Sequence, residues 1–215
     1  MAPIRIAALA VAVALAAGAH PTTAASSRPA LPGREAVYLG APSVRLDGPQ
    51  TDTETTVAIE GAVLHTGTIE FDIAGEVQPG FSQAVRGFVG FAFNLSGPNR
   101  YECVYLRVAN GRASSQEQRN HALQYISHPD FTWRRLREEK VSQYESYADI
   151  GEREWIHVRL VIEPSRVSVY INGAPRPSLA VDRLPPEGPD TGRLALWAAV
   201  GSTAHYRNLV ITPAG

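Results

Sequence analysis

The stretch from Arg100 to Tyr147 is rich in side chains that could bind a ligand or take part in catalysis. Arginines, histidines, tyrosines and one tryptophan alternate there with amides and carboxylates. Sugars and similar polar ligands are held by planar donors, planar acceptors and aromatic faces, so this mixture is typical of a polar binding surface. The alternative is a solvated face of a twisted sheet with a few internal ion pairs. We favour the binding surface, because clusters of interacting polar groups tend to mark functional sites.

Alternation along a strand predicts which of these side chains face the same way. In the expected strand 101–108, Tyr105 and Arg107 lie on the face opposite the apolar core residues, and the turn that follows leaves Asn110 and Arg112 at its rim. The same reasoning, carried through the next segments, predicts a concave ligand-binding site made of Tyr105, Arg107, Asn110, Arg112, Gln124, His128, Trp133, Arg137 and Glu145.

Each part of this predicted site has an expected role. We interpret residues 133–137 as a further strand whose odd-numbered side chains share one face. The arginines and Gln124 would hold hydroxyl or carboxylate groups, and Trp133 or Tyr105 would stack on a sugar ring. The alternative for the charged members is that they neutralise one another beneath a loop.

Glu145 is the best single candidate for a catalytic carboxylate, because it lies between Tyr144 and Tyr147 in the polar stretch. Acid–base catalysis needs a carboxyl group whose environment is tuned by burial and neighbouring charges. Partnering Arg107 or Arg137 structurally is the alternative role for Glu145, since Arg–carboxylate pairs commonly support polar networks.

Signals for metals, cofactors and activated nucleophiles are weak. His121 and His128 are seven residues apart without a third ligand at a spacing typical of zinc sites. The sequence has no Asp-rich calcium loop, although a calcium ion held by backbone carbonyls would leave no sequence signature. It also has neither a Gly-x-Ser-x-Gly elbow nor a phosphate-binding loop. We therefore expect no cofactor.

The N-terminus has the layout of a secretory signal peptide. Arg5 precedes an unbroken apolar run over residues 6–17, and small residues follow, with cleavage expected near Ala19 or Ala25. A membrane anchor is the alternative, but a spanning helix needs ~20 apolar residues. We expect a signal peptide over 1–25, a flexible lead-in over 26–36, and a single domain over 37–213 in a secreted protein.

Composition narrows the class of partner. About 190 mature residues suit one β-sandwich domain. A net charge of -1 argues against a general nucleic-acid or anionic-membrane binder, since those need excess basic charge. Cys103 is the only cysteine, so no intrachain disulfide can form, and its strand context predicts a buried free thiol. The expected partner is a carbohydrate or another polar small molecule, and the oligomeric state stays open.

Short alternating runs bounded by Gly, Pro, Asn or Asp predict an all-β protein. Only the segment 114–118 suggests a brief helical turn. Alternation also predicts a core built from Ile156, Val158, Leu160, Val167, Val169 and Ile171. The expected strands are 37–46, 56–64, 68–73, 87–95, 101–108, 155–162, 167–171, 192–199 and 205–212, with further strands between 108 and 155.

Several of these strands resemble those of laminin-G-like and concanavalin A-like domains. The segment Glu-Trp-Ile-His-Val-Arg-Leu-Val-Ile over 154–162, followed by Val-Ser-Val-Tyr-Ile-Asn-Gly over 167–173, is similar to their Trp-strand-turn-strand hairpin. Gly-Thr-Ile-Glu-Phe-Asp over 67–72 and Gly-Arg-Leu-Ala-Leu-Trp over 192–197 match two other strands. The resemblance implies a two-sheet antiparallel jelly roll whose concave face commonly carries carbohydrate sites, and the segment 100–147 resembles secreted bacterial members.

Three functions remain open under this resemblance. The leading one is a secreted carbohydrate-binding or glycan-associated protein, the second is a glycan-cleaving hydrolase or lyase using the same face, and the third is an adhesion domain. Some members of the superfamily hydrolyse β-glucans with two glutamates on one strand. Glu70 and Glu76 invite comparison, but a regular strand puts them ~20 Å apart. Glycosidase carboxyl pairs are ~5–9.5 Å apart, so this pair is excluded.

Overall fold

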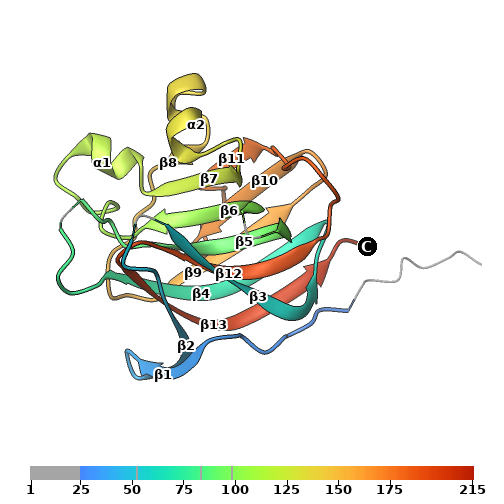
Figure 1. The fold of residues 1–215 in the computed structure, drawn as a ribbon, viewed down its shortest axis with the longest axis horizontal. Helices are drawn as coiled ribbons and strands as arrows, with labels where there is room; N and C mark the ends of the chain where they lie inside the picture. The colour runs from blue at the N-terminus through green and yellow to red at the C-terminus, as the bar shows by residue number, and fades with distance from the viewer. Residues whose placement is uncertain (1–24, 52, 83, 98) are drawn as a thin grey trace, which may run out of the picture.

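Two antiparallel sheets pack face to face in the computed structural model, which describes residues 25–51, 53–82, 84–97 and 99–215 (Figure 1). Apart from Ala25, the predicted signal peptide lies outside the described residues. Within the described ranges, no helix has the length and apolar character needed to span a membrane. The all-β, two-sheet jelly-roll sandwich expected from the sequence is confirmed.

The two sheets differ in size, and short helices lie at one end of the sandwich. The seven-stranded sheet has the order β1 (Arg34–Tyr38), β2 (Ala41–Asp47), β13 (Ser202–Pro213), β4 (Gly67–Val77), β9 (Ile156–Ile162), β10 (Arg166–Ile171), β11 (Leu179–Asp182). The six-stranded sheet has the order β3 (Glu54–Val63), β12 (Arg193–Ala199), β5 (Phe88–Gly97), β6 (Arg100–Arg107), β7 (Leu123–His128), β8 (Glu145–Ser146). Helices α1 (Gln116–Asn120) and α2 (Trp133–Glu139) stand at the β7–β8 end of the sandwich (Figure 1).

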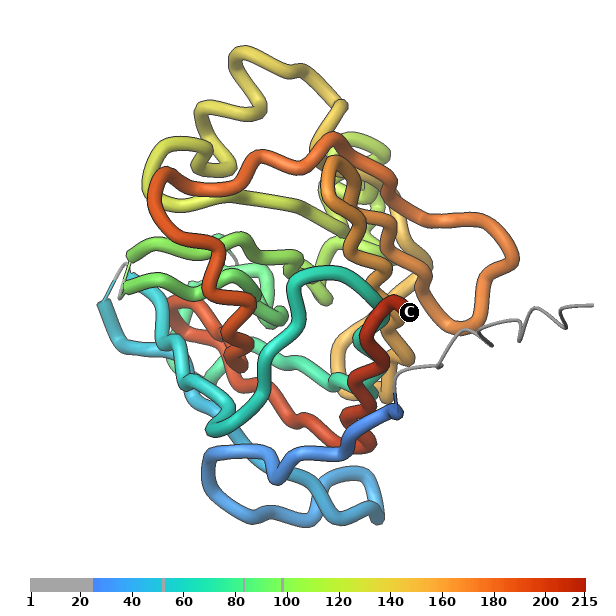
Figure 2. The backbone as a smooth tube through the Cα atoms, turned by 90° about the vertical axis from the view of Figure 1, so that its right-hand side faces the viewer, coloured from blue at the N-terminus to red at the C-terminus, as the bar shows by residue number. Residues whose placement is uncertain are grey.

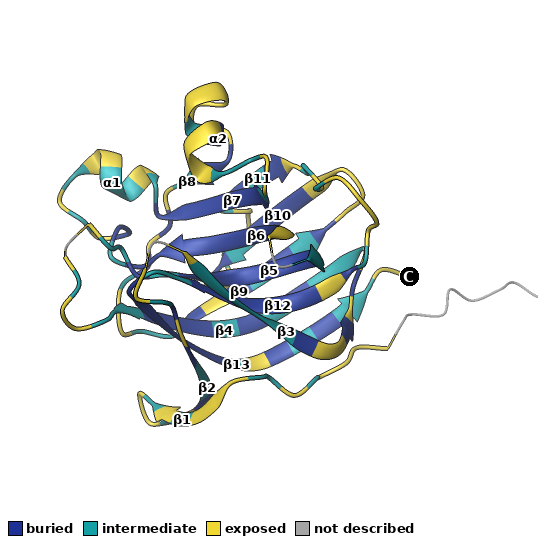
Figure 3. Cartoon of the chain, in the orientation of Figure 1, coloured by how far each residue is buried: buried dark blue, intermediate teal, exposed yellow. Residues whose placement is uncertain are grey.

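The core lies between the sheets and follows the predicted alternation. Phe71 of β4 and Phe91 of β5 stack across the interface with ring centroids 4.9 Å apart. The six predicted core residues of the β9–β10 hairpin are all buried, and β6 and β7 of the six-stranded sheet are largely dark blue in Figure 3. Cys103 of β6 is a fully buried free thiol, as predicted. Burial of these apolar faces stabilises the sandwich by roughly 25 cal/mol per Å² of apolar surface removed from water.

The expected early strand 37–46 is wrong, because the chain folds back in the middle of it. Leu39 and Gly40 both adopt positive φ angles, 49° and 75°, which is the conformation of a two-residue hairpin turn. β1 and β2 therefore pair with each other around this turn. Gly40 adopts a positive φ without strain. Leucine rarely adopts one, so nothing in the sequence indicates that the turn begins at Leu39.

Residues 133–137 form the first part of helix α2 rather than the strand expected from the sequence. The Thr132 side chain caps the helix by accepting a hydrogen bond from the backbone N–H of Arg135. Strand parity therefore does not apply here, but Trp133 and Arg137 are four residues apart and still share a face. The helical turn expected over 114–118 is present slightly later, as α1, capped by Ser115.

The stretch 26–36, expected to be a flexible lead-in, is partly attached to the sandwich. Ser27 exchanges backbone hydrogen bonds of 2.8 and 2.9 Å with Ile211 of β13, and the hydroxyl groups of Ser26 and Thr212 are 2.7 Å apart. β1 begins at Arg34, within the expected lead-in. Figure 2 shows this N-terminal segment, in blue, beside the red C-terminal strand.

Candidate functional site

A pocket of about 620 Å³ lies over the outer face of the six-stranded sheet, on the side away from the core. Helix α2, the end of α1 and the segment before β5 form its walls. Six of the nine predicted site residues line it, namely Tyr105, Arg107, Asn110, His128, Trp133 and Arg137. Glu54, Arg86, Phe88, His121, Ile126 and Trp197 also line it.

One row of residues across five strands forms the pocket floor and its support. Trp197 pairs with Gly90, Gly90 with Tyr105, Tyr105 with Gln124, and Gln124 with Glu145. Because Gly90 has no side chain, the rings of Trp197 and Tyr105 meet above it, with centroids 4.9 Å apart and planes 27° apart. A Cβ atom on Gly90 would lie 2.4 Å from the Val104 carbonyl oxygen and 2.5 Å from Tyr105 Cβ.

Tyr105 supports the pocket rather than offering an open ring. It is only 3% exposed, because Trp197 stacks on it and the Arg107 guanidinium lies 5.0 Å from its ring centroid. Burial raises the pKa of Tyr105 to about 12, so its phenol stays protonated. Of the two aromatic residues expected to stack on a sugar, Trp133 is therefore the exposed one, at 40%.

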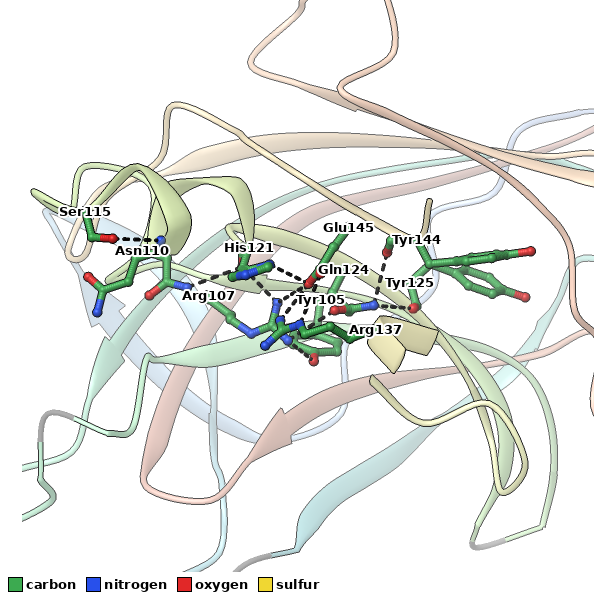
Figure 4. Close-up of polar contacts among 11 residues, drawn as sticks. Tyr105, Arg107, Asn110, Ser115, His121, Gln124, Tyr125, Arg137, Tyr144 and Glu145 are labelled. Carbon is green, nitrogen blue, oxygen red and sulfur yellow. Dashed lines mark hydrogen bonds and ion pairs between the residues drawn. The ribbon is translucent and has the colours of Figure 1, made fainter. Parts of the chain in front are cut away.

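Arg107 is buried and held by uncharged acceptors (Figure 4). Its Nη1 donates to the His121 carbonyl oxygen at 2.8 Å. Its Nη2 donates to Tyr105 Oη at 2.8 Å and to Gln124 Oε1 at 3.1 Å. Gln124 is in turn fixed by donating to the backbone oxygens of Tyr125 and Tyr144, so its amide supports Arg107 from below and does not line the pocket.

Glu145 is the single carboxylate in the group that we call the arginine cluster, which consists of Arg107, His121, Arg137 and Glu145. Arg137 grips it with two hydrogen bonds, 3.1 Å from Nε and 2.6 Å from Nη2. Arg107 Nη1 lies 3.9 Å from Glu145 Oε2. His121 Nδ1 lies 2.8 Å from the same oxygen but lacks the alignment of a hydrogen bond. Glu145 is buried behind the pocket, and this geometry matches the structural role expected as its alternative.

A second polar group lies on the same face around Glu54. Tyr101 donates a hydrogen bond of 2.7 Å to Glu54 Oε1 and accepts one of 3.2 Å from Trp197 Nε1. His128 stacks on Tyr101 with centroids 5.1 Å apart, and its Nε2 lies 3.6 Å from Glu54 Oε1. Burial lowers the pKa of His128, so its imidazole is the neutral form at pH 7. This end of the pocket is therefore acidic.

Arg112 is the predicted site residue that the structure places elsewhere. Its exposed guanidinium pairs with Asp149 at 2.8 Å and with Glu154 at 2.7 Å, and it does not line the pocket. The turn after β6 does reach the rim, but it brings Asn110 to the pocket and turns Arg112 away. Strand parity could not decide this, because side-chain directions in a turn do not alternate.

Glu54, Arg86 and Trp197 line the pocket but were absent from the predicted site. Glu54 is the first residue of β3, and Arg86 lies just before β5 begins. At these positions no alternating pattern shows which face of the sheet a side chain occupies. Trp197 lies in β12, where every residue from Leu194 to Ala199 is apolar, so the sequence does not distinguish the two faces of this strand. Only the pairing of β12 with β5, which is not readable from one sequence, reveals that Trp197 lies beside Tyr105.

Two other parts of the molecule make weaker candidates. A hollow of about 880 Å³ lies along the N-terminal segment and β1–β2, over the bulged part of β13, but two of its polar lining residues, Arg207 and Asn208, are already hydrogen-bonded to Asp72. Across the described ranges, no three His, Cys, Asp or Glu side chains are grouped as metal ligands would be. The pocket on the six-stranded sheet is therefore the candidate functional site.

Comparisons with known proteins bear on the fold. No protein-family model and no curated protein sequence matches the chain. Among solved structures, a carbohydrate-binding module, CBM66 from Bacillus subtilis, is 13% identical, with a TM-score of 0.54 over 89% of this chain and 98% of that one. The exoplasmic/lumenal domain of VIP36, in its metal-free form, is 11% identical, with a TM-score of 0.52 over 84% of this chain and 83% of that one. With the two-sheet topology, these matches show that the chain shares the antiparallel two-sheet jelly-roll fold of these proteins.

Proposed function

We propose that this protein binds a carbohydrate in the pocket on the outer face of its six-stranded sheet. The observation that carries the proposal is Trp133, a residue that is 40% exposed and lines a pocket with several polar side chains. Saccharides are bound by such an arrangement, because an aromatic face packs against the C–H groups of a sugar while fixed polar groups bond its hydroxyls.

Arg137 holds the Trp133 ring in place. Its guanidinium carbon lies 5.1 Å from the ring centroid, and its two donors are fixed on Glu145. A ring that is already oriented loses less conformational entropy when a sugar stacks on it. At the pocket wall, Asn110 and Glu54 offer acceptors for hydroxyl groups. The Bacillus subtilis neighbour is a carbohydrate-binding module, which agrees in kind with this proposal.

Binding without cleavage is the form of the proposal that the pocket supports. A glycosidase needs two carboxyl groups at the scissile bond, ~5–9.5 Å apart. Among the described residues that line the pocket, Glu54 is the one carboxylate, and Glu145 lies behind it with its oxygens engaged by Arg137. The hydrolase or lyase remains the second candidate because Glu54, Tyr101 and His128 form an acid–base group at one end of the pocket.

The test is a glycan array followed by calorimetric titration of every saccharide that binds, with product analysis of the same panel to detect cleavage. Trp133→Ala is expected to weaken binding at least ten-fold, about 1.4 kcal/mol, without changing the fold. Tyr147→Ala is the matched control, because Tyr147 is 47% exposed but does not line the pocket. The proposal is refuted if no saccharide binds, or if both variants bind like the parent protein.

We also propose that the protein is exported. The apolar run over residues 6–17 after Arg5 supports this, with cleavage near Ala19 or Ala25. N-terminal sequencing of the protein recovered from the medium of an expressing bacterium is expected to begin near His20 or Ser26. Material that begins at Met1 would contradict export through this segment.

A further inference from the structure

The pocket has more positive than negative charge, although the whole chain has a net charge of -1. Three arginines line it, Arg86, Arg107 and Arg137, against one lining carboxylate, Glu54. Even when the buried Glu145 is counted with them, one positive charge is left over before either histidine is protonated. Arg107 and Arg137 lie beside Glu145 in the arginine cluster, whereas Glu54 is hydrogen-bonded to Tyr101.

Arg107 shows where the surplus lies. Its side chain is 6% exposed, and its hydrogen bonds go to a backbone oxygen, a phenol and an amide, none of which is charged. The nearest carboxylate, Glu145, is 3.9 Å away and is already held closely by Arg137. A buried guanidinium with an incomplete counter-charge is costly, so an anion in the pocket would be favourable beside it.

Asn110, in the same wall, has an acceptor with no donor. The residue is 4% exposed, and its Nδ2 donates to the His121 carbonyl oxygen at 3.4 Å, which fixes the orientation of the amide. Its Oδ1 is buried and has no hydrogen-bond partner among the described atoms. Buried polar atoms are nearly always paired, so an unpaired acceptor in a pocket wall points to a ligand hydroxyl.

Arg86 lies at this end of the pocket as well. Its carbonyl oxygen accepts a hydrogen bond of 3.1 Å from the N–H of Ala109, and Phe88 pairs with Arg107, so the backbone places Arg86 next to Arg107 and Asn110. No ion pair or side-chain hydrogen bond joins its guanidinium to another described residue. Among the arginines that line the pocket, Arg86 therefore has its N–H donors available for a ligand. The planar guanidinium can form two parallel hydrogen bonds to a carboxylate or sulfate.

We infer that the saccharide bound in this pocket carries an anionic group, a carboxylate or a sulfate, held by Arg86 and Arg107, with a neighbouring hydroxyl of the sugar donating to Asn110 Oδ1. Other uncharged hydroxyls face Glu54, because a second anion there would be repelled. The inference rests on the proposed carbohydrate binding and adds the chemical class of the sugar. It makes Arg86 a specificity-determining residue and leaves Trp133 as the stacking residue.

Uronate oligosaccharides of the gluco, galacto and manno series, each paired with its methyl ester, test the inference directly. Esterification removes the charge and leaves the sugar skeleton unchanged. Sulfated galacto-oligosaccharides and their desulfated counterparts form a second arm, which distinguishes sulfate from carboxylate. We expect an acidic saccharide to bind at least ten-fold tighter than its neutral counterpart, with a preference that shrinks as salt is raised. Equal binding within every pair overturns the inference but leaves carbohydrate binding intact. No binding in either arm also overturns the inference, and the glycan array then decides whether the protein binds carbohydrate at all.

Substitutions of Arg86 test whether this residue causes the preference for acidic over neutral saccharides. Arg86→Gln is expected to reduce the acidic-over-neutral ratio about ten-fold, while Arg86→Lys, which keeps the charge, retains part of it. Arg166→Gln is the matched control, because it removes the same charge from an exposed position on β10, away from the pocket. If the control lowers the ratio as much as Arg86→Gln, net charge rather than the site governs binding and the inference fails.

Discussion

Removal of the Glu145 carboxylate is expected to destabilise the protein far more than removal of a comparable carboxylate at the surface. Glu145→Ala takes away two hydrogen bonds from Arg137 and the nearest counter-charge of the buried Arg107. Removing one partner of a buried ion pair costs ~3–5 kcal/mol. Since the Arg137 side chain is about one-third exposed and can be rehydrated, we expect the lower end, about 3 kcal/mol. For a domain of this size that corresponds to a fall of roughly 6–12 °C in Tm.

Equilibrium unfolding in urea, followed by far-ultraviolet circular dichroism, measures this free energy. Glu139→Ala is the matched control, because Glu139 also pairs with an arginine of α2, Arg135, at 2.9 Å, but both side chains are about half exposed. Such a surface pair contributes ~0.3–0.5 kcal/mol. Both arginines therefore belong to one short helix, and the two pairs differ in burial, with Glu145 on β8 and Glu139 on the helix itself. If Glu145→Ala and Glu139→Ala cost the same, burial of the arginine cluster does not stabilise the fold and our reasoning about it is wrong.

Three further predictions follow from buried groups. Cys103, whose pKa is raised by burial, should react with a thiol reagent only after unfolding, and rapid labelling of the native protein would contradict its position. Burial lowers the pKa of both His128 and His205, so the native state binds fewer protons than the unfolded chain. The free energy of unfolding in urea should therefore be highest above pH ~6.5 and fall as the pH drops below that value. In His205→Gln this fall should be less steep. Gly90→Ala should cost about 1–3 kcal/mol by overpacking, whereas Gly97→Ala, whose nearest neighbour would be 3.9 Å away, should cost less in the same unfolding assay.

Strand alternation predicted the fold and part of the site because both depend on local pattern. The β9–β10 hairpin alternates cleanly, and its apolar side chains are buried as expected. The same rule put Tyr105 and Arg107 on one face of β6, and the structure places both in the pocket. Period-two patterns survive in such strands because successive side chains must point to opposite faces of a sheet.

Helix α2 was missed because its sequence carries little apolar periodicity. Leu136 is its only buried residue, and the rest of the helix is charged apart from Trp133. Its formation depends on the Thr132 cap and on the helix preference of arginine and glutamate, which are weak signals in one short segment. Glu54 and Arg86 were missed for a different reason, since each reaches the pocket only through strand pairings between distant parts of the chain.

The attachment of α2 has a consequence for its motion. A seven-residue helix is too short to be stable alone, and α2 is held to the sandwich chiefly by Leu136 and by the grip of Arg137 on Glu145. Elements with few buried contacts open more often than the core, so its amides should exchange with solvent early. Under the proposed function, a sugar stacks on Trp133 only while the helix is docked. It should therefore slow hydrogen exchange in α2 without changing exchange in β9.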